Sequence, residues 1–239
     1  MNLVLDIGNS CVKIAVFDGK IKISSERISD FDHETFEKII SSFTFNKAII
    51  SSVGVAPKFI TDILASRGVF IHTLSYKSKL PFEIQYKTPE TLGADRIAAL
   101  AGAFNLSKNE NIMIIDSGTA ITYDFLIKGI YKGGNISPGI NIRFKALHHF
   151  TGKLPLLAVS ENFDSPGQTT NDAILSGVIN GTIYEINEYI RAFKTKYENN
   201  KIILTGGDGE YINTKLNNEI MLIPDLVNEG LNFILEHNA

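Results

Sequence analysis

Two aspartates stand where a short apolar run ends, and each is followed two residues later by a glycine. The first pair is Asp6 and Gly8, and the second is Asp116 and Gly118. A glycine-containing turn between strands lets backbone N–H groups approach a phosphate without a side chain in the way. A carboxylate would repel a bare phosphate, so its presence predicts a cation between the two. One such segment alone favours an ordinary strand end, whereas two in matching register favour a metal-nucleotide site.

Polar side chains beside these turns could add to phosphate binding. Asn9, Ser10 and Thr119 supply donors. Lys13 could reach a phosphate or point to solvent, and the alternation of a strand leaves both orientations open.

A third glycine turn follows the apolar residues 202–204. Gly206 and Gly207 stand between a predicted strand and a predicted helix, where they would permit close approach of a base or ribose. Strand-to-helix turns often contain glycine, so this signal is weak by itself.

The segment Gly93-Ala94-Asp95-Arg96 begins an amphipathic helix pattern. Asp95 could be a helix cap or a partner of the helix dipole. Arg96 does not fit that interpretation, because a cation is disfavoured beside the positive end of a helix. The alternative is a site in which Arg96 binds an acid and Asp95 deprotonates a hydroxyl, and the spacing alone does not choose between the two.

The elements that must position these residues occur twice. Each aspartate segment opens a predicted three-stranded meander, with turn signals at Asp18-Gly19 and Lys128-Gly129. Helix and strand patterns then alternate. Helices are predicted at residues 33–43, 57–67, 93–106, 141–150, 170–197 and 227–237, and strands at 47–53, 69–74, 201–204 and 219–223.

This duplicated order predicts an α/β fold with two similar lobes. Residues 1–110 would form the N-terminal lobe, with the first phosphate loop and the Gly93-to-Arg96 helix. Residues 111–239 would form the C-terminal lobe, with the second phosphate loop and the glycine turn at 206–207.

Composition narrows the class of protein. Of the 239 residues, 44% are hydrophobic and 21% charged, as in soluble globular proteins. A net charge of −3 provides no basic surface for nucleic acid, and we expect no membrane span or signal peptide.

Cys11 is the only cysteine, which excludes an intrachain disulfide and suits a reducing cytoplasm. With no histidine nearby in sequence, Cys11 reads as a packing residue rather than a nucleophile. The histidines lack metal-ligand spacing.

The motifs, taken together and in order, resemble a known family. DIGNS at residues 6–10 and DSGTAIT at 116–122 resemble the acetate and sugar kinase/Hsp70/actin superfamily. That resemblance implies a duplicated ribonuclease-H-like (actin-like ATPase) fold with a central mixed sheet in each lobe. With GADRIAAL at 93–100, GGNISPGI at 133–140 and GQTTNDAILSG at 167–177, the chain is similar to the type III pantothenate kinases. These enzymes use ATP to phosphorylate pantothenate to 4′-phosphopantothenate, the first step of coenzyme A biosynthesis.

The resemblance implies a role for each motif position. Asp95 would be the general base. The pantothenate site would comprise Tyr86, Gly93, Ala94, Asp95, Arg96 and Thr170. ATP would be bound by Asp6, Ile7, Gly8, Asn9, Ser10, Cys11, Val12, Lys13, Thr119, Gly206 and Gly207. Asp116 matches the ligand of a monovalent cation, K⁺ or NH₄⁺, and Asp6 would lie near the Mg²⁺ that accompanies ATP. Ser10 stands where threonine is commoner, which keeps the hydroxyl.

The family also implies a cytoplasmic homodimer, in which the helix predicted at 170–197 could line the subunit seam or lie in the core. Two rival interpretations stay open. The chain could be another small-molecule kinase of the superfamily, which the Gly93-to-Arg96 segment would distinguish. It could instead be a catalytically silent, nucleotide-binding regulatory homologue. Loss of Asp6, Asp95 or Asp116 would have indicated the latter, and all three are present.

Overall fold

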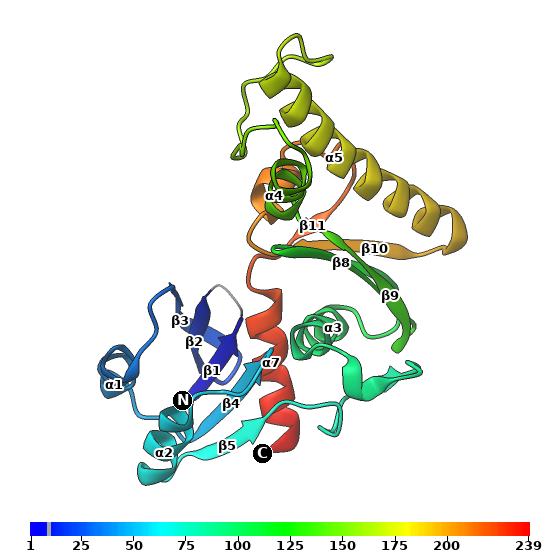
Figure 1. Cartoon of the computed structure of the whole chain (residues 1–239). Coiled ribbons are helices and arrows are strands. Elements are labelled where there is room, and N and C mark those ends of the chain that lie inside the picture. The colour runs from blue at the N-terminus through cyan, green and yellow to red at the C-terminus, as the bar shows by residue number, and fades with distance from the viewer. Residues whose placement is uncertain (9–10) are drawn as a thin grey trace. The chain divides into compact units, whose positions relative to one another are not determined.

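A computed structural model describes residues 1–8 and 11–239, so the predicted phosphate contacts Asn9 and Ser10 lie outside the described residues (Figure 1). The chain forms two compact units. Unit 1 comprises Met1–Asn109, Gly129–Tyr131 and Asp225–Ala239, and unit 2 comprises Glu110–Lys128 and Lys132–Pro224. The two-lobe division at residue 110 assigns residues 225–239 to the C-terminal lobe, whereas in the structure this segment packs with the N-terminal residues.

Unit 1 is built on a five-stranded mixed sheet of order β3-β2-β1-β4-β5. Its strands are β1 (Asn2–Ile7), β2 (Val12–Asp18), β3 (Ile21–Ile28), β4 (Lys47–Ser52) and β5 (Phe70–Thr73). The central strand β1 is antiparallel to β2 and parallel to β4. The meander β1-β2-β3 is therefore formed as expected, and its first turn precedes β2.

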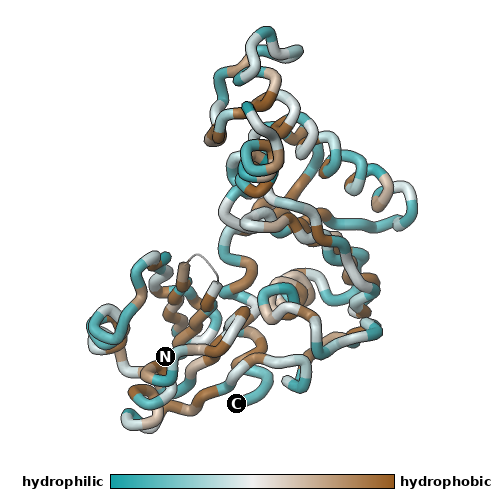
Figure 2. The backbone as a smooth tube through the Cα atoms, in the orientation of Figure 1, coloured by the Kyte–Doolittle hydropathy of each residue, from teal (hydrophilic) through white to brown (hydrophobic). Residues whose placement is uncertain are grey.

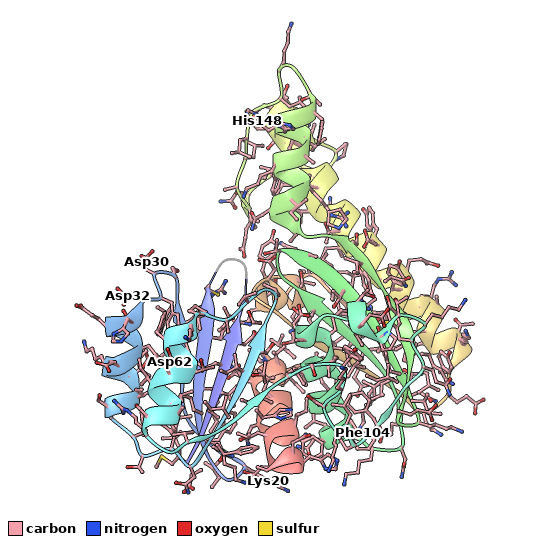
Figure 3. The ribbon with its side chains drawn as sticks, turned by 60° about the horizontal axis from the view of Figure 1, so that its bottom comes forward. Lys20, Asp30, Asp32, Asp62, Phe104 and His148 are labelled. Carbon is pink, nitrogen blue, oxygen red and sulfur yellow. The ribbon has the colours of Figure 1, made fainter. Side chains whose placement is uncertain are left out.

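Helices cover both faces of this sheet. On one face, α1 (His33–Ser41) and α2 (Lys58–Ser66) bury Phe36, Ile40, Ile60 and Leu64 in a core with the sheet. Asp32 caps α1 by accepting a 2.8 Å hydrogen bond from the Thr35 amide (Figure 3).

The other face carries α3 (Ala94–Leu106) and α7 (Leu226–Asn238), which pack closely on each other and against β1 and β4. A Cβ at Gly230 would overlap the Ala98 carbonyl oxygen, so the glycine permits this close approach. The Asn2 side chain on β1 donates hydrogen bonds to Asn232 (2.8 Å) and Glu236 (2.7 Å) on α7. These bonds join the first strand to the last helix.

Unit 2 contains most of a second sheet, whose full strand order is β11-β10-β7-β8-β9-β6, with β6 (Glu83–Ile84) in unit 1. Its strands are β7 (Asn111–Ser117), β8 (Ala120–Ile127), β9 (Ile130–Pro138), β10 (Asn200–Thr205) and β11 (Met221–Leu222). Its helices are α4 (Ile140–Phe150), α5 (Thr170–Lys196) and α6 (Gly209–Asn213). Figure 2 shows hydrophobic residues along the central strands of both units.

The two sheets have the same topology, which confirms the duplicated fold. Strand β7 is antiparallel to β8 and parallel to β10, as β1 is to β2 and β4. Each central strand thus ends at an aspartate segment.

Two short elements were not expected from the sequence. Strand β6 (Glu83–Ile84) pairs with Ile130 and Tyr131 at the start of β9, and a 3₁₀ helix, η1, spans Pro89–Thr91. Both lie in the segment that leads to α3. No helix among the described residues is long and apolar enough to cross a membrane.

Candidate active site

Asp6 lies between two polar neighbours on β1. In the strand register it stands opposite Lys13 on β2 and Ser51 on β4. Directly paired residues project to the same face of a sheet, so Lys13 points to the side of Asp6. The buried Ser51 hydroxyl donates a hydrogen bond of 3.3 Å to Asp6 Oδ1. The structure therefore resolves the orientation of Lys13 and adds Ser51, which the motif did not contain.

The electrostatic environment of Asp6 is mixed. Burial raises the pKa of Asp6, the charge of Lys13 lowers it, the charge of Asp95 raises it, and the Ser51 hydrogen bond lowers it, with a net upward shift. Asp95 is therefore close enough to Asp6 to influence its charge. Carboxylate and hydroxyl oxygens are donors that hard cations such as Mg²⁺ prefer, so the residues present fit such an ion.

The turn after Asp6 is closed by its own backbone. The Gly8 amide donates a 3.1 Å hydrogen bond to the Cys11 carbonyl oxygen. Arg27 Nε lies 3.0 Å from the half-buried Cys11 sulfur. Of the expected ATP-binding residues here, Val12 is buried and Ile7, Cys11 and Lys13 are half-buried.

Asp95 makes a contact at the start of α3. Its Oδ1 accepts a 2.8 Å hydrogen bond from the Arg96 amide in the first turn of α3. Gly93 is the N-cap of this helix, and a Cβ there would overlap the Asp95 carboxylate. The carboxylate thus supports the helix start and also lies near Asp6.

Arg96 is held inside unit 1 rather than at its surface. Only 7% of the residue is exposed, and Nη2 donates a 2.9 Å hydrogen bond to the hydroxyl of Tyr131, which is fully buried. The Tyr131 ring stacks against Tyr86 with centroids 5.8 Å apart and an interplanar angle of 29°. The phenol is one partner of the guanidinium near the start of α3.

Tyr131 was missed by sequence reasoning. It stands two residues before the GGNISPGI motif, which begins at Gly133, and carries no signal of its own. Its relation to Arg96 and Tyr86 depends on the pairing of β9 with β6, which only the folded chain reveals.

Asp116 occupies in unit 2 the place that Asp6 has in unit 1. In register it stands opposite Thr122 on β8 and Thr205 on β10. A neutral threonine therefore replaces Lys13, while a hydroxyl again stands on the parallel strand. Oxygen donors of this kind fit a hard monovalent cation.

The glycine turn after β10 packs against the same place. Gly206 has a φ of +96°, and a Cβ there would overlap both the Ser117 carbonyl oxygen and the Asp116 carboxylate. The Asp208 amide donates a 2.9 Å hydrogen bond to the Ser117 carbonyl oxygen. Gly207 is exposed beside this contact.

Thr119 lies exposed in the turn between β7 and β8. Its carbonyl oxygen accepts a 3.1 Å hydrogen bond from the Gly139 amide, which precedes α4. A Cβ at Gly139 would overlap the Gly118 and Thr119 carbonyl oxygens, so this turn is tightly packed from behind. Thr119, Gly206 and Asp116 are thus brought together in unit 2.

Thr170 lies in a different part of unit 2, on an open apolar pocket of about 830 Å³ between α4 and α5. The pocket is lined by Arg143, Leu147, Phe150, Thr170, Ile174 and Val178, among others. Phe150 is 83% exposed beside it.

Arg143 is held on this pocket by a polar network. Its Nη2 contacts Glu185 at 2.5 Å, and Glu185 also accepts a 2.9 Å hydrogen bond from Tyr123. Burial acts to raise the pKa of Glu185, but hydrogen bonds from Arg143, Ser137 and Tyr123 outweigh it and hold that pKa below its usual value. The predicted acceptor residues thus fall into two sets, with Tyr86 and residues 93–96 in unit 1 and Thr170 in unit 2.

The chain matches one protein family over most of its length. Residues 2–192 match the family model described as type III pantothenate kinase. A relative named type III pantothenate kinase from Porphyromonas gingivalis strain W83 is 40% identical over 242 residues, covering 100% of this chain and 99% of that protein. A relative of the same name from Bacteroides fragilis strain YCH46 is also 40% identical, over 239 residues and 100% and 98% of the two chains.

Solved structures resemble the fold at lower identity. A Campylobacter jejuni protein described as a Baf family transcriptional activator has a TM-score of 0.62 and 24% identity, with 99% of this chain and 98% of that chain covered. A glucokinase from an Antarctic psychrotroph has a TM-score of 0.53 and 11% identity, with 99% and 98% covered. These likenesses support the duplicated α/β fold.

Proposed function

The chain belongs to the type III pantothenate kinase family, and on that basis we propose that it transfers the γ-phosphoryl group of ATP to the primary hydroxyl of pantothenate, giving 4′-phosphopantothenate. The observation that carries this proposal is the arrangement of Asp95 and Arg96 in the first turn of α3, with Asp95 close enough to Asp6 to raise its pKa. A base, an acid-binding cation and a second carboxylate are the groups that this reaction requires.

Asp95 acts as the general base. Phosphoryl transfer depends on alignment and charge neutralisation more than on covalent help from the protein. Asp95 accepts the proton of the attacking hydroxyl, while Arg96 binds the carboxylate or an amide oxygen of pantothenate. Gly93 and Ala94 form the helix start beneath the acceptor, and Tyr86 and Thr170 contact it.

Each unit carries its own candidate contacts for ATP. In unit 1 the segment from Asp6 to Lys13 supplies amide donors and the Lys13 ammonium group, which faces the side of Asp6. In unit 2 Thr119 contacts phosphate, and Gly206 and Gly207 leave room for the adenosine. Asp6 is the candidate ligand for Mg²⁺, which when bound neutralises charge on the transferred group.

Asp116 is the candidate ligand for K⁺ or NH₄⁺. The support is the strand register, in which Asp116 stands between Thr122 on β8 and Thr205 on β10, so hydroxyl oxygens flank the carboxylate.

We further propose a cytoplasmic homodimer. Thr170 lies on the open pocket between α4 and α5, where the exposed Phe150 could be covered by a second copy of the chain. Analytical ultracentrifugation tests this directly, and a monomer at micromolar concentration would argue against it.

A coupled assay of ADP release tests the function. We expect release that depends on pantothenate and falls when Na⁺ replaces K⁺. Release with another hydroxyl acceptor, and none with pantothenate, would identify a different small-molecule kinase. Binding of ATP without release on any acceptor would favour a catalytically silent regulatory homologue.

A further inference from the structure

Tyr131 touches two residues of the proposed acceptor site without belonging to any sequence motif. Its hydroxyl accepts a 2.9 Å hydrogen bond from Arg96 Nη2, and its ring stacks on Tyr86. Both partners, like Tyr131 itself, lie in unit 1. One side chain therefore contacts both the residue expected to bind the acid and an aromatic residue expected to line the site.

The backbone of Tyr131 is fixed independently of its side chain. It pairs with Ile84 on β6, and its carbonyl oxygen accepts a 3.0 Å hydrogen bond from the Gln85 amide. Tyr86 follows directly, so the main chain that carries Tyr86 is held to the residue whose ring supports it. The phenol is thus a rigid reference point for this part of the site.

The side chain of Arg96 needs a fixed hydrogen-bond partner to hold it in one orientation. An arginine side chain has several rotatable bonds, and ordering it costs conformational entropy, whereas its planar fork loses less once it is preorganised. The positive end of α3 repels a cation, so a neutral oxygen placed beside the guanidinium favours one orientation. Tyr131 is 0% exposed, which excludes water as a competitor for that hydrogen bond at the phenol.

We propose that Tyr131 is a positioning residue for the acceptor site. Its hydroxyl orients Arg96 toward the acid end of the acceptor, and its ring sets the position of Tyr86. The proposal rests on the assignment of Arg96 and Tyr86 to pantothenate binding, and it adds a residue that acts through both.

The variant Tyr131→Phe tests the hydroxyl alone, because it keeps the ring and the stack. We expect KM for pantothenate to rise about tenfold, the effect of losing one hydrogen bond to a charged group. KM for ATP should stay within twofold of wild type, and kcat should change less than KM. Tyr211→Phe is the control, since it removes another tyrosine hydroxyl, which donates a 3.4 Å hydrogen bond to the Ser160 carbonyl oxygen in unit 2. It should leave KM for pantothenate within twofold of wild type.

A double-mutant cycle tests whether the effect passes through Arg96. Measured as kcat/KM at low pantothenate, Tyr131→Phe should cost about tenfold in the wild-type background and less than twofold beside Arg96→Ala. An equal loss in both backgrounds, or an unchanged KM for pantothenate in Tyr131→Phe, would overturn the proposal. Tyr131→Leu also removes the ring and should raise that KM further. A wild-type protein with no pantothenate-dependent ADP release would instead overturn the proposed function, and this inference with it.

Discussion

The hydroxyl of Ser51 lies 3.3 Å from the carboxylate of Asp6, and the two residues are paired in register across the parallel strands β4 and β1. Thr205 has the same register relation to Asp116 in the second sheet. A hydroxyl on the neighbouring parallel strand is therefore a shared feature of the two aspartate sites. It is the part of each site that the Asp-x-Gly motif does not contain.

Ser51→Ala should weaken Mg²⁺ binding at Asp6. Without the hydroxyl the carboxylate loses a donor that favours its ionised form, so we expect the Mg²⁺ concentration for half-maximal activity to rise about three- to tenfold. Ser52→Ala is the neighbouring control, because Ser52 stands opposite Ile7 in the register instead of Asp6. Equal effects of the two substitutions on a magnesium titration would contradict a role for Ser51.

Asp6→Asn should lower the activity and raise the stability of the metal-free protein. Activity should fall by at least about 10²-fold, since even residues behind a metal ligand cost 10- to 100-fold. Burial raises the pKa of Asp6, so its ionised form is disfavoured in the folded, metal-free protein.

The pH dependence of that stability gain follows from the sign of the shift. Below the pKa of Asp6 in the unfolded chain, about 3.8, the side chain is neutral in both the folded and the unfolded protein. The Asp6→Asn variant is then no more stable than the wild type. As the pH rises through the higher folded pKa, the wild type loses stability and the variant does not. Thermal unfolding without Mg²⁺ should therefore show a higher Tm for Asp6→Asn at pH 7.5 and no gain near pH 3.5. A lower Tm at pH 7.5 would show that Lys13 and Ser51 outweigh the burial.

Asp95→Asn should reduce kcat by about 10²- to 10⁴-fold, the usual contribution of a positioned base. The amide oxygen can still accept the hydrogen bond from the Arg96 amide, so the start of α3 should be retained. Calorimetry should accordingly find ATP binding nearly intact. The exposed Asp62 on α2 offers a control, as Asp62→Asn should alter neither quantity (Figure 3). Unchanged turnover in Asp95→Asn would exclude Asp95 as the base.

Asp116→Asn should abolish the dependence on the monovalent cation. The wild type is expected to lose most of its activity when Na⁺ replaces K⁺, whereas the variant should be equally slow in both salts. Measuring ADP release in matched chloride buffers separates this effect from ionic strength. A variant that is still stimulated by K⁺ would place the cation at other ligands.

Much of this architecture could be predicted from local patterns. The aspartate turns, the duplicated meander and the amphipathic helices all have short-range signals. What could not be predicted depends on pairing between distant segments. Ser51 and Tyr131 reach the site only through the register of β4 with β1 and of β9 with β6. A two-residue strand such as β6 is too short for a hydrophobic period.

The sequence also could not predict which sheet the last helix, α7, packs against. Its 3.6-residue period predicted a helix at residues 227–237, but a period does not say which sheet the apolar face covers. In the structure α7 packs on β1 and β4, and Asn2 is bonded to Asn232 and Glu236.

This return of α7 to the first strand has a consequence for synthesis on the ribosome. Strand β1 is made first, yet the face that it shares with β4, on which α3 also packs, is not fully covered until residues 225–239 have emerged. These two strands carry Val4 and Ile49, which are fully buried in the finished protein. Apolar residues of the first strands therefore stay available to a nascent-chain chaperone until the chain is nearly complete.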